Sequence, residues 1–324
     1  MPQNIQSDLE MGKKKPESWK PKIKIWDGTN VHGSYDTLVG AQLTDMLKLM
    51  GFDAEHKGQW SFEDLHNGKM AFVTHPRRLA SINPYTVSQR DAEKFILQMF
   101  KGALPRNICM TVVAHGHSTR GSIDDDPFRV INLPCWTSFI EYQKALANFP
   151  HFQPDIGAYF IIITKDGRVH TQKWLYKPFV YNHFEGKIYE ETGTPEEEAK
   201  KKKFVPEDKV IVENYLLGML RDAKFIVVAI ADFHIGEVCS IAPPKYTLGG
   251  REHDLSSELT EANKKIYRYW QNFVEVCKLI KPHEIWMVGD ALGGTTIFEK
   301  NRIVLKSTLE EQKAMFAELF KLFL

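Results

Sequence analysis

Short apolar runs alternate with amphipathic segments along most of the chain. Runs rich in Val, Ile and Phe predict strands at residues 22–26, 69–75, 107–117, 128–134, 158–167, 168–176, 224–234 and 283–294. Apolar residues at helical spacing predict helices at residues 33–51, 88–102, 210–222, 258–280 and 308–324. Strands that alternate with helices in this way are typical of an α/β fold.

Two polar segments flank or interrupt this pattern. Residues 1–21 are polar and lysine-rich without an apolar stretch, so we expect a disordered leader and no secretory signal. Residues 191–209, ETGTPEEEAKKKKFVPEDK, combine a block of acids with a block of bases and have no apolar face. They predict a linker. We expect the remainder, 22–324, to form a single domain.

Composition narrows the class of protein. The chain has 324 residues, of which 43% are hydrophobic and 26% charged, enough for a sizeable core. A formal net charge of +1 favours no particular partner through a long-range field. The four cysteines form no CxxC pair, and no run reaches the length of a membrane span. We therefore expect a soluble, cytoplasmic protein with no membrane partner.

Side chains that commonly bind metal ions follow five of the predicted strands. They are Asn30 and His32, His75, His115 and His117, Asp232 and His234, and Asp290. Ligands of open α/β sheets gather at the carboxyl ends of strands, so we expect these side chains to converge. Imidazole and carboxylate without thiolate favour Mn, Fe, Zn, Co or Ni. The set is too large for one ion and predicts two divalent transition-metal ions, about 3.5–4 Å apart and bridged by a carboxylate.

Each candidate also has a simpler interpretation. The DxH spacing places Asp232 and His234 on one side of their strand, although the same pair could cap a helix. Asn30 could be a turn residue in DGTN. His75 is an isolated histidine, and the chain offers three rivals for its role: His56, His66 and His183.

Taken together, DFH, GD, GTNVH, a lone strand-end histidine and HGH resemble the calcineurin-like metallophosphoesterase superfamily. Its blocks are DxH, GDxxD, GNH[DE], H and GHxH, and their counterparts here span roughly residues 22–135 and 224–295. The resemblance implies two mixed β-sheets sandwiched between helices in four layers. The sequence departs from the family blocks at two places. GDALGG lacks the second acidic residue of GDxxD, and Val31 separates Asn30 from His32, which are adjacent in GNH[DE].

The order of the blocks differs from the family order, in which DxH and GD come first. Reading residues 210–324 and then 22–190 restores the family order. The resemblance therefore implies a circular permutation, in which the linker 191–209 joins the ancestral C-terminus to the ancestral N-terminus.

The resemblance also implies roles for the candidate residues. One ion would be held by Asp232, His234, Asp290 and His117, and the other by Asp290, Asn30, His75 and His115. Asp290 would then be the bridging carboxylate, and His32 would be the catalytic proton donor or transition-state stabiliser. Arg77, Arg78 and Arg120 follow ligand candidates and could contact a phosphate or remain solvated surface charges.

The implied function is a dinuclear metal-dependent phosphohydrolase in which a metal-bridging hydroxide cleaves a phosphoester. Analogy favours a phosphodiesterase or nuclease, with nucleic acid or a nucleotide as substrate. A phosphomonoesterase, a non-catalytic scaffold or binding member of the same fold, and a metallohydrolase of another class remain alternatives. A single closed chain and a swapped dimer are both open as quaternary arrangements.

Overall fold

The computed structural model describes residues 19–28, 39–75, 93–94, 96–114, 117–119, 122–123, 128–140, 154–177, 179–182, 185, 187–190, 220–293 and 308–324. The strands of the two large sheets are β1 (Lys22–Trp26), β2 (Ala54–His56), β3 (Trp60–Asp64), β4 (Met70–Thr74), β5 (Ile108–Val113), β6 (Arg129–Asn132), β8 (Ile156–Thr164), β9 (Val169–Tyr176), β12 (Ala223–Ala231) and β15 (Glu284–Val288). The smaller sheets contain β7 (Phe139–Ile140), β10 (Phe179–Asn182), β11 (Lys187–Glu190), β13 (Lys245–Leu248) and β14 (Arg251–Asp254). The labelled helices are α2 (Val39–Leu49), α7 (Glu261–Ile280) and α8 (Leu309–Lys321).

The predicted α/β class is confirmed. All eight predicted strands are present, as β1, β4, β5, β6, β8, β9, β12 and β15. The three best-described helices match the predictions at 33–51, 258–280 and 308–324, and residues 96–100 and 220–221 are helical within two further predicted helices. The sequence pattern missed β2, β3, β7, β10, β11, β13 and β14.

The larger sheet contains six strands in the order β2-β1-β15-β12-β8-β9. β12, β15, β1 and β2 run parallel to one another, whereas β8 pairs antiparallel with both β12 and β9. β1, the first strand of the described chain, therefore continues the parallel order beyond β15, the last strand of the described chain. Both strands are mainly apolar and buried along most of their length, and they also contain Lys22 and Lys24 in β1 and Glu284 in β15.

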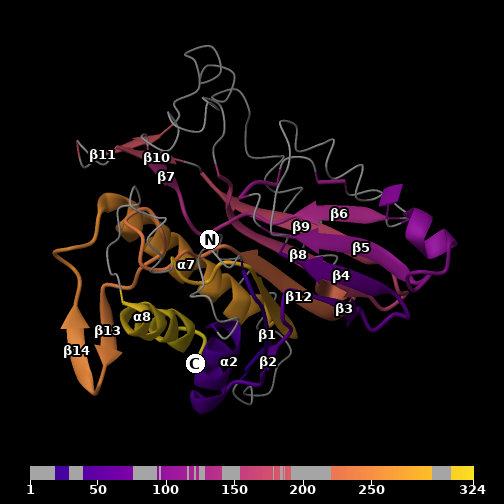
Figure 1. Ribbon diagram of the computed structural model, residues 1–324, viewed down its shortest axis with the longest axis horizontal. Coiled ribbons are helices and arrows are strands. Elements are labelled where there is room, and N and C mark those ends of the chain that lie inside the picture. Colours follow the sequence, from indigo (N-terminus) through magenta and orange to yellow (C-terminus); the bar gives the residue numbers. More distant parts are fainter. Residues whose placement is uncertain are drawn as a thin grey trace, which may run out of the picture.

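The second large sheet contains four strands in the order β3-β4-β5-β6, with β4, β5 and β6 parallel. A continuous apolar cluster contains residues of both sheets, including Trp26, Val227 and Trp286 from the six-stranded sheet and Val73 and Val112 from the four-stranded sheet. Successive residues of a strand point to opposite faces, so one face of each sheet contributes to this shared layer. The two sheets thus pack through it (Figure 1).

The other face of the six-stranded sheet packs against α2, α7 and α8 (Figure 1). Ile23 and Ile25 of β1 point to this face, opposite to Trp26. Helix α7 begins with a capping box between Thr260 and Asn263, which pairs backbone donors that a helix start otherwise leaves unpaired. Trp270 lies within this core and donates from Nε1 to the Leu319 carbonyl at 3.1 Å, a usual length for such bonds.

The beginning and the end of the described chain lie side by side. Trp19 packs against Phe323, with ring centroids 6.3 Å apart, and its Nε1 donates to the Pro282 carbonyl at 3.0 Å. Trp19 lies within the segment expected to be a disordered leader, of which residues 1–18 are outside the described chain. Ordered packing therefore begins at least three residues before β1.

A buried ion-pair network links the two sheets. Lys24 of β1 contacts Glu63 of β3 at 2.8 Å and Glu284 of β15 at 2.7 Å. Trp286 also donates to Glu284, and Ser61 donates to Glu63. Burial alone would lower the pKa of Lys24, but the hydrogen bonds and charges of both glutamates outweigh burial, and the pKa is raised above its usual 10.5.

Lys24→Met is expected to lower the free energy of unfolding by about 3–5 kcal/mol, because it leaves the buried Glu284 without a cation and Glu63 with Lys57 alone. Lys22→Met is the matched control: Lys22 lies on the same strand, but its pair with Glu55 is 36% and 41% exposed. The control should change stability by less than about 1 kcal/mol. Urea unfolding of both variants measures the difference. Equal effects would show that the network contributes no more than a surface pair.

The raised pKa of Lys24 also predicts how its contribution to stability depends on pH. A group whose pKa is higher in the folded state contributes its full stabilisation below its unfolded pKa, here 10.5, and loses it as pH rises through the folded value. The stability difference between wild type and Lys24→Met should therefore be constant between about pH 7 and about pH 10, where the glutamates are ionised, and shrink above it.

Candidate metal centre

Four strands bring five of the predicted ligands together. β12 leads directly into Asp232 and His234, and β15 is followed by Asp290. β4 is followed by His75, and the segment after β5 contains His117. Because these are the carboxyl ends of parallel strands in two packed sheets, the side chains meet at one edge of the shared apolar layer, as the sequence predicts.

The first group consists of His117, Asp232 and His234, whose ligand atoms lie within 4.8 Å of one another. His234 Nε2 and His117 Nε2 are 3.2 Å apart, and His117 Nε2 is 3.7 Å from Asp232 Oδ2. Two nitrogens bound at 2.0–2.1 Å to one tetrahedral ion would be separated by about 3.3–3.4 Å. The spacing of the two imidazoles therefore fits a shared cation.

The second group consists of His75, Asp232 and Asp290. His75 Nε2 lies 3.1 Å from Asp232 Oδ1 and 3.6 Å from Asp290 Oδ2. Asp232 is the residue that the two groups share, and its two carboxylate oxygens face different histidines. The bridging role that the resemblance assigns to Asp290 stays a prediction, and the geometry offers Asp232 as a second candidate for it.

Burial and charge act against each other in this cluster. Burial would lower the pKa of His75, but the hydrogen bond and charge of Asp232 outweigh it and raise that pKa. Burial likewise would lower the pKa of His234, which the charges of Glu237, Asp290 and Asp232 raise instead. The pKa of Asp232 is lowered because the three histidines around it outweigh the effect of burial. The charges in the cluster therefore stabilise the ionised carboxylate of Asp232 and the positively charged forms of the histidines around it.

Access to the cluster differs between its members. Asp232, His234, His75 and Asp290 are each at most 3% exposed. The side chain of His117 is 18% exposed, so it forms the more open side of the described cluster. A buried set of ionisable groups with shifted pKa values at the end of a sheet is typical of a functional site.

The backbone is strained at three of these residues. His117, Asp232 and His234 have φ values of 49°, 49° and 48°, and they make up three of the five non-glycine residues with positive φ in the described chain. A left-handed conformation costs roughly 1–2 kcal/mol for an L-residue with a Cβ atom. Such strain concentrates at functional sites, where the surrounding structure holds it in place.

Main-chain hydrogen bonds hold the strained residues. The Asp290 amide donates to Asp232 Oδ1 at 3.2 Å, and the His234 amide donates to the Asp290 carbonyl at 3.0 Å. The Trp136 amide donates to the Asp232 carbonyl at 3.1 Å. These hydrogen bonds fix the segments that follow β12 and β15 relative to each other.

Glycines make room for the cluster. Gly289 has φ +99°, and a Cβ atom on it would lie 2.2 Å from His75 Cδ2 and 2.5 Å from Asp232 Oδ1. A Cβ atom on Gly28 would lie within 3 Å of Asp290. Only glycine lets these two backbones approach the ligand side chains so closely.

Two acidic residues that sequence reasoning missed support the candidate ligands. Glu237 Oε1 lies 3.5 Å from His234 Nδ1, three positions along the chain, and is 6% exposed. Asp155 accepts hydrogen bonds from Ser118 and from the Thr119 amide, and its own amide donates to the His117 carbonyl. Glu237 was visible in the stretch ADFHIGE, but nothing in the sequence distinguished Asp155.

Glu237→Gln is expected to weaken metal binding about 10- to 100-fold, because a carboxylate next to the distal nitrogen of a metal-binding histidine orients the ring and raises its basicity. Titration with Zn²⁺ or Mn²⁺ against a competing chelator measures the change. Glu252→Gln, an exposed change on β14, is the control and should leave the affinity unchanged. Equal affinities of wild type and Glu237→Gln would contradict this role.

Several predicted residues lie outside the described chain. They are Asn30, His32, His115, Arg77, Arg78 and Arg120, together with the linker 191–209 and the rival His183. The two other rivals of His75 lie elsewhere: His56 pairs with Asp27 at 2.9 Å, and His66 packs against Phe225. Among the described histidines that compete for this role, only His75 lies next to both Asp232 and Asp290.

The donor set fits a borderline transition metal. Three imidazoles and two carboxylates without a thiolate are the ligands preferred by Zn, Mn, Fe, Co and Ni. Both groups share one residue, as a pair of closely spaced ions would require. His117, His234 and Asp232 could hold one ion, and His75, Asp290 and Asp232 a second.

None of the described helices is both long enough and apolar enough to cross a membrane. The chain was also compared with protein-family models, curated proteins and solved structures, and none of the three comparisons gives a match. The resemblance to a known superfamily therefore rests on the motif residues alone.

Proposed function

We propose that the protein is a dinuclear metal-dependent phosphohydrolase. The observation that carries the proposal is the pair of His/Asp groups that share Asp232 at the carboxyl ends of β12, β15 and β4. When bound, two such ions supply a hydroxide at neutral pH and stabilise the charge on the phosphoryl oxygens. A phosphodiester, including nucleic acid or a nucleotide, is the favoured substrate class.

The chain's own residues have distinct tasks in this proposal. Asp232 holds both groups together, while His75 and Asp290 complete one and His117 and His234 complete the other. Glu237 and Asp155 orient His234 and the His117 segment through the contacts described above. His32, in a part of the chain outside the described residues, is proposed as the proton donor to the leaving group.

We also propose that the fold is a circularly permuted four-layer sandwich of the metallophosphoesterase type. Three features support this. Both large sheets pack on a common apolar layer, with α2, α7 and α8 on the outer face of the larger one. β1 extends the parallel order β12-β15-β1 beyond the last strand of the chain. Trp19 and Phe323 bring the described ends into contact, at the point where the unpermuted chain would be continuous.

The test is metal reconstitution followed by phosphoester turnover. Purified protein is stripped with a chelator, reloaded with Mn²⁺, Ni²⁺ or Zn²⁺, and its metal content measured by mass spectrometry. Each sample is then assayed with bis-p-nitrophenyl phosphate and p-nitrophenyl phosphate. About two ions per chain with preferential diester hydrolysis supports the proposal, whereas preferential monoester hydrolysis would assign a phosphomonoesterase. Two bound ions without turnover of either ester would favour a non-catalytic binding protein.

A further inference from the structure

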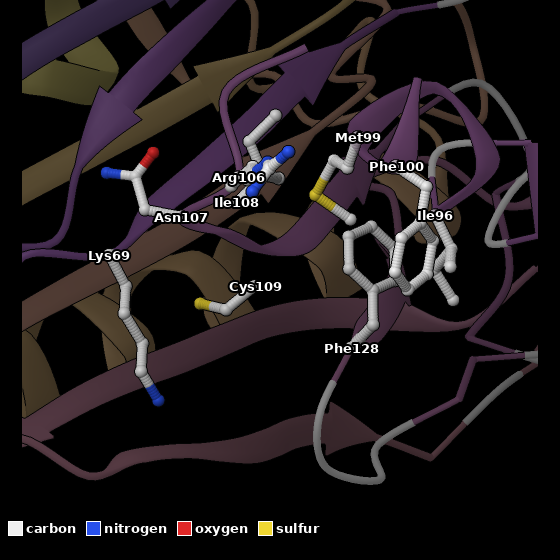
Figure 2. A pocket seen from close by; sticks show the side chains of 9 residues that line it. All are labelled: Lys69, Ile96, Met99, Phe100, Arg106, Asn107, Ile108, Cys109 and Phe128. Atoms are coloured by element: carbon white, nitrogen blue, oxygen red, sulfur yellow. The ribbon is translucent and has the colours of Figure 1, made fainter. Parts of the chain in front are cut away.

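A separate cavity opens at the other end of the strands that carry His75 and His117. Its volume is about 490 Å³, within the usual range for small-molecule sites. Nine residues line it: Lys69, Ile96, Met99, Phe100, Arg106, Asn107, Ile108, Cys109 and Phe128 (Figure 2). Lys69 immediately precedes β4 and Asn107 immediately precedes β5, whereas the candidate ligands follow these strands.

One side of the cavity is apolar. Figure 2 shows Ile96, Met99, Phe100 and Phe128 gathered there. Phe100 is 81% exposed although it lines the cavity, so its ring remains available for contact with a bound apolar group. Burial of such surface favours binding in proportion to the apolar area removed from water.

The opposite side is basic. Lys69 and Asn107 lie there, away from the phenylalanines (Figure 2), and Arg106 also lines the cavity. Neither the Lys69 ammonium nor the Arg106 guanidinium forms an ion pair or side-chain hydrogen bond with any residue that the structure describes. None of the nine lining residues is acidic. Among the described residues, the cavity therefore presents two positive charges without an acidic partner next to an apolar wall.

We propose that this cavity binds an amphipathic organic anion, with its apolar body against Met99, Phe100 and Phe128 and its anionic group near Lys69 and Arg106. A medium-chain fatty acid has this chemistry. Charge complementarity selects an acid over a neutral amphiphile, and the apolar wall selects a hydrocarbon chain over a small inorganic anion.

The site is distinct from the metal centre. The five residues of β4 separate Lys69 from His75, and six steps of about 3.3 Å place these two residues about 20 Å apart. Binding of the anion does not depend on the proposed hydrolase activity. The two proposals can therefore fail independently.

Calorimetric titration of the full-length protein with decanoate, in comparison with decanol, tests the proposal. Decanoate should bind, and decanol should bind at least about fivefold more weakly, because it lacks the charge. Affinity should fall about three- to fourfold for each methylene removed in the series decanoate, nonanoate, octanoate, which corresponds to about 0.8 kcal/mol per buried CH₂. High salt should weaken the binding of decanoate more than that of decanol.

Variants with matched controls locate the binding. The double variant Lys69→Gln, Arg106→Gln should reduce decanoate affinity at least about fivefold and remove the preference over decanol. The double variant Lys245→Gln, Lys264→Gln, which removes two exposed cations elsewhere, should not.

A second pair of variants tests the apolar wall. Phe100→Ser should weaken decanoate binding about three- to tenfold. Leu97→Ser is its control, since Leu97 lies on the same helical segment, is 52% exposed and does not line the cavity. Both positions are exposed, so neither change should impair folding.

Asp232→Asn protein distinguishes this cavity from the metal centre, because a carboxylate could also bind to metal ions. Unchanged decanoate affinity in that variant supports the cavity. Loss of binding in Asp232→Asn would overturn the proposal, as would equal binding of decanoate and decanol, or no binding of either by the wild-type protein.

Discussion

Asp232→Asn is expected to reduce bound metal to well below one ion per chain and phosphodiester hydrolysis by at least about a thousandfold. Asp232 belongs to both His/Asp groups, so its neutralisation weakens both together. Asparagine has nearly the same shape as aspartate, but it lacks the negative charge that a divalent ion and the three histidines around it require. Metal content by mass spectrometry and turnover of bis-p-nitrophenyl phosphate measure the two effects.

Asp290→Asn provides the informative comparison. If Asp232 is the bridging carboxylate, Asp290→Asn should retain about one ion per chain, because the group of His117, Asp232 and His234 stays intact. If Asp290 bridges, as the resemblance implies, Asp290→Asn should lose both ions and Asp232→Asn should retain about one. Asp254→Asn, on the hairpin strand β14, is the control that should retain metal and activity. Full metal content in Asp232→Asn would contradict the proposed centre.

Gly289→Ala is expected to lower the free energy of unfolding by about 2–5 kcal/mol and to abolish metal binding. The new methyl group would lie 2.2 Å from His75 Cδ2 and 2.5 Å from Asp232 Oδ1, so the two side chains have to move. Overpacking of this kind costs about 1–3 kcal/mol, and the φ of +99° adds about 1–2 kcal/mol for a residue with a Cβ atom.

Gly68→Ala separates these two contributions. Gly68 has a φ of +80°, but a Cβ atom there would have nothing within 4 Å. The Gly68→Ala variant should therefore lose only about 1–2 kcal/mol of unfolding free energy, which is the cost of the left-handed backbone, and should still bind metal. Thermal unfolding and metal content of the two variants, measured side by side, give the comparison. Equal losses of stability together with normal metal content in Gly289→Ala would show that the cluster tolerates the displacement of His75.

The part of the fold that sequence could predict is the part with a strong apolar signal. β8 is buried at every position and β12 at its last six, so their runs of Ile, Val and Phe stand out against the polar segments. β14, REHD, has no apolar residue and pairs only with β13. Its strand conformation depends on a partner across a tight turn, which periodicity along a single segment does not reveal.

The candidate site was predictable for a related reason. Asp232, His75 and Asp290 each follow a strand whose end could be located from its apolar run, and parallel strands place such ends together. The sharing of Asp232, the left-handed backbone at His117, and the contact of Glu237 with His234 were not predictable. They depend on how two sheets pack, which is a property of the three-dimensional arrangement alone.

The contact between the described ends has a consequence for the order of events during synthesis. Trp19 meets Pro282 across 263 positions of the chain, and β1 has β15 as one of its two neighbours in the sheet. At 5–20 residues per second, a ribosome needs about 13–50 s to make the intervening chain. During that time β1 has no β15 to pair with, and one edge of an apolar strand stays open to other chains. Closure of the sheet is thus a late, long-range step, of the kind that slows folding and exposes nascent chains to aggregation.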